Sequence, residues 1–231
     1  MLRGKRKALT FSYDDGVTQD RRLIRLLDQY GLKATFNLNS ELLGHDGSLL
    51  REGVTVSHVK VPPEEAADLY RGHEIAVHTL THPNLTDVRE EAEIIRQTEG
   101  DRKNLSALAG YEVYGMAYPG GGVNYTEAIA EIIRRHTGVQ YARTTVCTGS
   151  FAWPRDLLIL HPTAFHKDFD RLFSLGEEFL RAEPEEPLLF YVWGHSYEFD
   201  IDDSWGRFEE FCRMMAGRDD IFYGTNGQIL L

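Results

Sequence analysis

The sequence predicts an α/β fold with a mostly parallel sheet, in one domain that spans residues 1–231. Short apolar, β-rich runs alternate with longer amphipathic runs along the whole chain, which is the pattern of strands joined by helical crossovers. The length of 231 residues, with 42% hydrophobic and 26% charged residues, fits a single globular domain of ordinary composition. We therefore expect one core.

The strands are predicted from the short apolar runs, because a strand in a parallel sheet is covered on both faces. In chain order they are residues 8–13, 34–38, 74–78, 114–118, 139–144, 157–160, 188–193 and 221–223.

The helices are predicted from apolar residues that recur on one face. In the first helix the apolar face holds Leu23, Ile24, Leu27 and Tyr30. Gly31 ends this helix, since glycine accepts the left-handed conformation after a helix. Similar patterns predict helices at residues 63–70, 87–108, 126–136, 168–181 and 204–215. Residues 41–61, with three glycines and a second β-like run at 54–59, are predicted to be an excursion between a strand and the next helix.

Charge and apolar length exclude several classes of partner. The net charge of -11 argues against nucleic acid, whose phosphates are neutralised by Lys and Arg. No apolar run reaches the roughly 18 to 20 residues that cross a bilayer, so no transmembrane segment is expected. The apolar stretch near the start of the chain is too short for a secretory signal. We expect a cytoplasmic protein as the sequence stands, or an extracytoplasmic one if a leader has been trimmed.

Metal-compatible and acid–base residues follow four predicted strands, where active sites of parallel folds gather. They are residues 14–16, 78–83, 118–122 and 193–198. Asp14 and Asp15 are adjacent carboxylates after a buried strand, and a nearby cation would offset the cost of burying them. An Asx turn closed by Gly16 is the simpler alternative for this pair taken alone.

His78 and His82 are separated by three residues directly after a predicted strand. Imidazole nitrogens suit Zn²⁺ and related divalent ions, and two histidines with one carboxylate leave positions open for water and substrate. Taken alone, two histidines at this spacing are more often a solvated or hydrogen-bonded pair. We nevertheless predict a metal site, because the residues that follow the other strands complement them.

The remaining two segments offer groups for acyl transfer. Pro119 and the three glycines after it can bring backbone N–H groups close to an oxyanion, although a flexible turn is the alternative. His195 follows the apolar run 188–193, where a general acid would be needed, although it could instead be a packed residue. The joint occurrence of all four segments favours an active site.

These motifs resemble those of the polysaccharide deacetylases that share the NodB homology domain, also called carbohydrate esterase family 4. Residues 12–16, Ser-Tyr-Asp-Asp-Gly, resemble the first motif, in which the first Asp is the catalytic base and the second binds metal. Residues 78–82, His-Thr-Leu-Thr-His, match the second motif, whose two histidines complete the metal site. The resemblance therefore implies that Asp14 is the base and that Asp15, His78 and His82 hold the metal.

The later motifs depart from the family pattern. Residues 117–121 align with the third motif, Arg-x-Pro-x-Gly, but Ala117 stands where the family has the arginine that orients the catalytic Asp. Arg143, at the carboxyl end of the next predicted strand, is our candidate for the missing cation. The fourth motif, an Asp–Trp element, is not identified. His195 aligns with the histidine of the fifth motif, which implies that it is the general acid.

By this resemblance the fold should be a distorted barrel of seven or eight β/α units with the site at its C-terminal mouth. A bound metal would lower the pKa of its water and polarise the acyl carbonyl. Glu198 or Asp200 could fix the tautomer of His195. In the loops of this mouth we expect the substrate contacts, at Tyr118, Gly120, Trp193 and Tyr197. Zn²⁺ is the default ion for nitrogen and oxygen ligands, with Co²⁺, Ni²⁺, Mn²⁺ and Fe²⁺ as alternatives.

The resemblance implies removal of an acyl group, foremost acetyl, from a carbohydrate, by a metal-dependent hydrolase. Hydrolysis of cyclic amides and deformylation of sugar-lipids are alternatives on the same fold, and a non-catalytic carbohydrate-binding domain is another. Fe(II) oxygenases also use two histidines and a carboxylate, but their antiparallel β fold does not fit the alternating β/α pattern. The sequence does not specify the oligomeric state.

Overall fold

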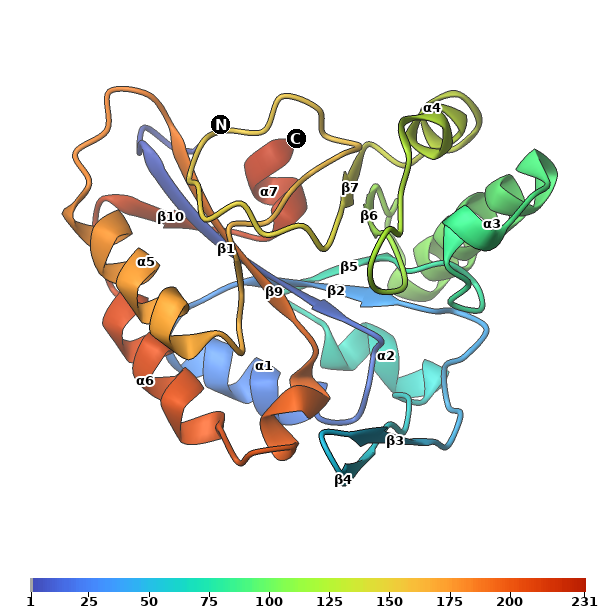
Figure 1. Cartoon of the computed structure of the whole chain (residues 1–231), viewed down its shortest axis with the longest axis horizontal. Coiled ribbons are helices and arrows are strands. Elements are labelled where there is room, and N and C mark those ends of the chain that lie inside the picture. The colour runs from blue at the N-terminus through green and yellow to red at the C-terminus, as the bar shows by residue number, and fades with distance from the viewer. Residues whose placement is uncertain (1) are drawn as a thin grey trace.

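A curled sheet of parallel strands forms a half-barrel with helices packed around its outside (Figure 1). The computed structural model describes residues 2–231. The eight-stranded sheet has the order β7-β6-β5-β2-β1-β9-β8, and β10 pairs with β1 beside this path. Its strands are β1 (Lys7–Asp14), β2 (Ala34–Leu38), β5 (Glu74–Val77), β6 (Gly115–Ala117), β7 (Tyr141–Arg143), β8 (Ala164–Phe165), β9 (Leu188–Gly194) and β10 (Ile221–Tyr223). The predicted fold class, a distorted barrel of mostly parallel strands, is confirmed.

The helices follow the strands as crossovers. They are α1 (Asp20–Gln29), α2 (Pro63–Leu69), α3 (Glu91–Ala109), α4 (Glu127–His136), α5 (Phe169–Arg181), α6 (Trp205–Met215) and α7 (Asn226–Leu230), with short 3₁₀ turns at Leu85–Asp87 and Ser196–Asp200. The short α7 closes the half-barrel at the amino-terminal half of its strands, where the Asn226 side chain bonds to Thr10 and Tyr191. Within residues 2–231, no helix is long and apolar enough to cross a membrane.

Strand β1 shows how the half-barrel sorts its side chains. All eight of its residues are buried, and alternate residues of a strand point to opposite faces. Leu9, Phe11 and Tyr13 pack into the large apolar core. Thr10, Ser12 and Asp14 lie on the other face, inside the half-barrel, where they bond to polar side chains of other elements. The alternation of side chains therefore places Asp14 inside the half-barrel, at the carboxyl end of the strand.

Two predicted elements differ from the structure. Residues 157–160 form a turn, which is joined to β7 by a bridge between Leu160 and Arg143 and by a hydrogen bond from Ala142 N to Leu157 O at 2.7 Å. The apolar run is explained by burial, because Leu158 and Leu160 pack in the core. Burial does not require that these residues pair as a strand. The two-residue β8, which pairs with β9, was not predicted because it is too short to show a period. Helix α3 begins at Glu91 rather than residue 87, since the Asn84 side chain caps a separate 3₁₀ turn.

The excursion at residues 41–61 contains a separate antiparallel hairpin, formed by β3 (Ser48–Arg51) and β4 (Val54–Ser57). It lies beside the carboxyl ends of the central strands (Figure 1). The segment after β4 returns along the start of the β1–α1 loop, where Thr18 N donates to Val59 O and Val61 N donates to Gly16 O, both at 2.9 Å. The hairpin is thereby attached directly to the loop that carries Asp15.

Asp20 joins α1 to two other elements and should make stability depend on pH. Its buried carboxyl accepts hydrogen bonds from Ser196 Oγ at 2.6 Å and Tyr70 Oη at 2.7 Å. Burial raises the pKa of Asp20 to about 7, whereas an Asp in an unfolded chain titrates near ~3.9. The folded state therefore binds the proton more tightly, so the contribution of Asp20 to stability falls as pH rises from about 4 to about 7, by roughly 1.4 kcal/mol per pKa unit.

We expect Asp20→Asn to gain stability relative to the wild type as pH rises from about 5 to about 8, because the amide carries no charge to bury. Urea denaturation of both proteins across this range measures the difference in unfolding free energy. A difference that stays constant with pH would contradict this assignment.

Candidate active site

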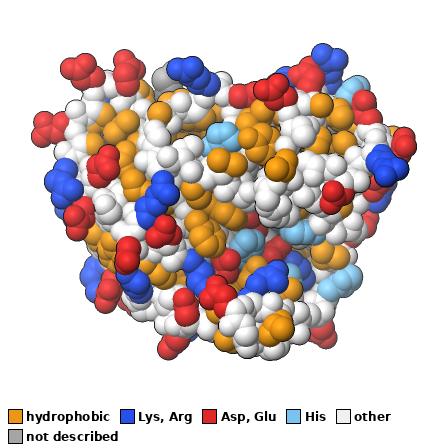
Figure 2. Space-filling view, in the orientation of Figure 1, with side chains coloured by type: hydrophobic (Ala, Val, Ile, Leu, Met, Phe, Trp, Pro, Cys, Tyr) orange, Lys and Arg blue, Asp and Glu red, His pale blue; other side chains and the backbone are white. Residues whose placement is uncertain are grey.

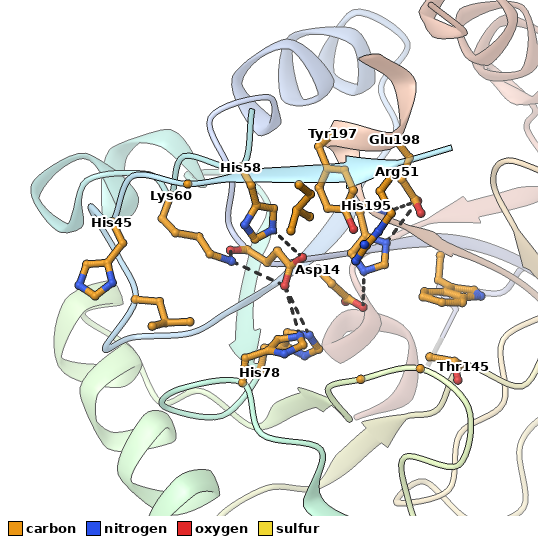
Figure 3. Close-up of a pocket in the computed structure, with 18 of the residues that line it drawn as sticks. Asp14, His45, Arg51, His58, Lys60, His78, Thr145, His195, Tyr197 and Glu198 are labelled. Carbon is orange, nitrogen blue, oxygen red and sulfur yellow. Dashed lines mark hydrogen bonds and ion pairs between the residues drawn. The ribbon is translucent and has the colours of Figure 1, made fainter. Parts of the chain in front are cut away.

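A cavity of about 600 Å³ opens at the carboxyl ends of the strands. All the residues predicted for the site line it except Arg143, which is buried behind it. Figure 2 shows histidine, acidic and basic side chains gathered in and around the hollow below the centre of that face. Figure 3 shows that these side chains converge from several loops and from the hairpin side. The post-strand residues that the sequence singled out are therefore neighbours in space.

Asp15, His78 and His82 bring their ligand atoms within 4.8 Å of one another. Asp15 Oδ1 lies 3.9 Å from His78 Nε2 and 3.5 Å from His82 Nε2. His78 Nδ1 lies 2.9 Å from the carbonyl oxygen of Ala117, which assigns the ring proton to Nδ1 and turns the lone pair of Nε2 toward Asp15. Burial lowers the pKa of His78 to about 4. The imidazole is therefore neutral, as a metal ligand must be.

The backbone of these loops is strained. Asp15, Thr79 and His82 have φ values of 82°, 67° and 61°, in a region that residues other than glycine seldom adopt, least of all a β-branched one. The surrounding structure holds the second loop in place. Asn39 Nδ2 donates to the carbonyl oxygens of His78 and Thr79, and Thr79 Oγ1 accepts from His82 N. Strain that is held by several contacts is typical of functional sites.

Asp14 is buried and paired with Arg143. Arg143 Nη2 lies 2.5 Å from both carboxylate oxygens, and Asn37 Nδ2 donates to Asp14 Oδ1 at 2.8 Å. Burial alone would raise the pKa of Asp14, but the charge and hydrogen bond of Arg143, together with the charges of His78 and His195, outweigh burial and lower this pKa. Asp14 is therefore ionised at neutral pH.

Arg143 reaches Asp14 from the strand next to the one that carries Ala117. Ala117 and Arg143 are register partners in the parallel pair β6–β7. Neighbouring strands lie about 4.8 Å apart, so a long side chain on either strand can reach the same point. The guanidinium also lies over the Trp193 ring, with Cζ 4.6 Å from the ring centroid.

His195 is a further neighbour of the Asp14 carboxylate. Its Nε2 lies 3.9 Å from Asp14 Oδ2, and its Nδ1 lies 3.2 Å from Glu198 Oε2. Burial opposes the charged imidazolium, but Glu198 and the two aspartates outweigh it and raise the pKa of His195 to about 9. His195 is therefore protonated at neutral pH, while Asp14 is ionised. Asp200, the alternative partner, instead bonds to Gln19 and Trp205.

Glu198 is held from behind by His166, a residue that the sequence did not indicate. His166 Nε2 lies 2.8 Å from Glu198 Oε2, and His166 is fully buried. A Cβ on Gly194 would lie 2.4 Å from the His166 ring, so glycine at position 194 leaves room for this histidine beside His195. Only the tertiary fold reveals the contact, because His166 follows a strand too short to predict.

The four residues predicted to contact substrate differ in their burial and in their partners. Tyr118 is buried and donates from its hydroxyl to Leu158 O, so its phenol is occupied inside the protein. Gly120 lines the cavity with φ 87° and lies against Asn84. Trp193 is half-buried and donates from its indole to Cys147 Sγ at 3.2 Å. Tyr197 is buried between the rings of His58 and His195.

The hairpin excursion supplies cavity residues that the sequence did not single out. Arg51, His58 and Lys60 line the cavity beside the predicted residues. The sequence pattern marked this stretch only as a β-like run, and nothing in its spacing pointed to Asp15. Its side chains nevertheless complete one wall of the site (Figure 3).

Comparison with known proteins gives a consistent result. The family model described as polysaccharide deacetylase matches residues 2–142. A probable polysaccharide deacetylase from Pseudomonas aeruginosa has a TM-score of 0.72 at 12% identity, covering 97% of this chain and 90% of that chain. A family 4 carbohydrate esterase from Streptomyces lividans, in complex with acetate, has a TM-score of 0.56 at 15% identity, covering 96% and 92%.

A family 4 carbohydrate esterase pseudoenzyme from Bacillus anthracis is also similar, with a TM-score of 0.53 at 16% identity, covering 99% of this chain and 66% of that chain. No curated protein matches the sequence at a significant level. At these identities the solved structures establish a common fold.

Proposed function

Because the chain belongs to the polysaccharide deacetylase family, we propose that it is a metal-dependent hydrolase that removes acetyl groups from a carbohydrate. The observation that carries this proposal is the convergence of Asp15, His78 and His82 beside the Asp14–Arg143 pair. A metal-ligand set next to an ionised carboxylate is what hydrolysis by activated water requires.

Asp15, His78 and His82 would hold the metal. Their donor set of two imidazole nitrogens and one carboxylate oxygen fits a borderline divalent ion, with Zn²⁺ as the default. The neutral His78, whose Nδ1 is satisfied by Ala117 O, supports this fit. When bound, the ion would activate water and polarise the acyl carbonyl.

The other residues handle protons. Asp14 is placed to accept one, since Arg143 and Asn37 keep it ionised and fixed in orientation. His195 is placed to donate one to the leaving amine or alcohol, since Glu198 keeps it charged. Opposite protonation states in neighbouring groups are the usual basis of an acid–base pair. Gly120 and Gly121 line the cavity without a side chain, so their N–H groups can donate to the oxyanion.

The arrangement favours catalysis over a binding role without turnover. One similar structure is a pseudoenzyme, but here the proposed base, the proposed acid and the three proposed metal ligands all line one cavity. Cyclic amides and formylated sugar-lipids remain substrates to be tested, because the shift of the arginine from position 117 to 143 departs from the family's third motif.

The test is an assay of acid release. We expect the purified protein to release acetate from N-acetylglucosamine oligomers or O-acetylated xylan fragments, to stop after dialysis against a chelator, and to recover when Zn²⁺ or Co²⁺ is restored. Cyclic imides and N-formylated sugar-lipids serve as competing substrates in the same assay. Activity that persists in fully metal-free protein, or turnover of a competing substrate alone, would contradict the proposal.

A further inference from the structure

The segment that follows the hairpin places two side chains against the loop of Asp15. Residues 58–61 run in extended form, where His58 and Lys60 fall on the same face. Backbone bonds fix this segment on both sides: His58 N donates to Gly47 O at 2.8 Å, and Val61 N donates to Gly16 O at 2.9 Å. The position of His58 is therefore set by the backbone.

His58 and Lys60 both contact Asp15. His58 Nε2 lies 3.0 Å from Asp15 Oδ2, while Lys60 Nζ donates to the Asp15 backbone carbonyl at 2.6 Å. Burial raises the pKa of Asp15, but the hydrogen bond from His58 and the charges of Lys60, His195 and His82 outweigh burial and hold that pKa well below its usual range. The Lys60 contact also holds the carbonyl of a residue with φ 82°.

The two carboxylate oxygens of Asp15 therefore have different partners. Oδ2 faces His58 at 3.0 Å, and Oδ1 faces His78 Nε2, His82 Nε2 and Lys60 Nζ at 3.9, 3.5 and 3.6 Å. The His58 ring is held in turn by Tyr197, at 5.2 Å between ring centroids and with the planes at 78° (Figure 3). Rotation of the carboxylate would break the bond to His58, so this contact favours one orientation.

We propose that His58 is a positioning residue of the metal centre, which occupies Oδ2 of Asp15 so that Oδ1 alone is presented to the ion. The group whose ligand atoms all lie within 4.8 Å of one another comprises Asp15, His78 and His82. His58 lies outside this group and acts through the carboxylate. Hydrogen bonds of this kind hold metal ligands in orientation, and their loss costs about 10–100-fold in affinity. The inference rests on the metal site of the proposed function.

The test measures metal affinity in protein stripped with a chelator. Titration calorimetry with Zn²⁺ should give one site per chain in the wild type, and His58→Ala should weaken its Kd by about 10–100-fold. His58→Gln should recover much of the loss, since its amide can donate to Oδ2. His45→Ala is the matched control, because His45 lies on the same excursion with an exposed side chain, and its Kd should equal that of the wild type.

Co²⁺ absorption separates positioning from direct ligation. At saturation, His58→Ala should keep the wild-type visible spectrum, because the ligand set is unchanged. A wild-type Kd in His58→Ala would overturn the inference, as would a changed spectrum at saturation, which would make His58 a ligand. If His58→Ala does not fold, a His58→Gln affinity as weak as that of Asp15→Asn overturns it as well. None of these outcomes depends on acetate release, whereas a wild type that binds no ion would refute the proposed function itself.

Discussion

Asp14→Asn is expected to lower turnover by about 10²–10⁴-fold, the range for loss of a general base, while the metal bound per chain stays at the wild-type level. Asp14 accepts bonds from Arg143 and Asn37, and it is not one of the three residues whose ligand atoms cluster. An amide at this position keeps the size of the side chain but is far too weak a base to take a proton. Acetate release and metal analysis on the same preparations measure both quantities.

The matched control for this variant is Asp15→Asn, at the adjacent residue. Because Asp15 Oδ1 lies among the ligand atoms, its replacement should lower both metal content and turnover. If Asp14→Asn also lost its metal, the division of labour between the two aspartates would be wrong. If it kept wild-type turnover, another group would have to accept the proton.

Arg143→Ala is expected to lower turnover at neutral pH by roughly 10²-fold, the cost of misplacing a reacting group by about 1 Å, and to leave metal content unchanged. It also leaves the buried Asp14 charge unpaired, which should destabilise the fold by about 3–5 kcal/mol. Without the guanidinium, burial dominates and the pKa of Asp14 rises. Part of the lost activity should therefore return as pH increases.

The geometry offers a direct rescue of this variant. Since Ala117 is the register partner of Arg143, adding Ala117→Arg to Arg143→Ala should return a cation to Asp14 from the neighbouring strand. We expect the double variant to recover turnover and unfolding free energy relative to Arg143→Ala. Arg143→Lys tests geometry, because it keeps the charge but loses the planar fork. Wild-type kinetics in Arg143→Ala would rule out an orienting role.

The sequence predicted the residues whose positions depend on local rules. Asp14, Asp15, His78 and His195 follow strands that are visible as apolar runs, and the carboxyl ends of parallel strands gather at one edge. The structure accordingly lines one cavity with them. Arg143 was proposed from its position at the end of the next strand, as a replacement for the third-motif arginine that is absent at Ala117.

The residues that the sequence did not indicate depend on contacts between distant segments. His58 meets Asp15 across 43 positions, and His166 meets Glu198 across 32. His166 follows the two-residue β8, which is too short to show a period, and the β-like run that contains His58 gave no sign of a contact with Asp15. Residues 157–160 show the opposite kind of error. Their apolar run predicted a strand, but Leu158 and Leu160 are buried in the core from a turn. Local patterns thus predicted the elements of the half-barrel, and tertiary packing decided which further side chains complete its mouth.

Ala117 and Arg143 lie side by side on neighbouring strands, and this position of the arginine bears on how distant homologues are classified. A search that demands arginine at a set place in a linear motif would score this chain as having lost an essential group. The guanidinium is nevertheless present, supplied from one strand over. Sequences that lack the motif arginine should therefore be sorted by whether an adjacent strand can deliver a replacement, before they are counted among inactive descendants.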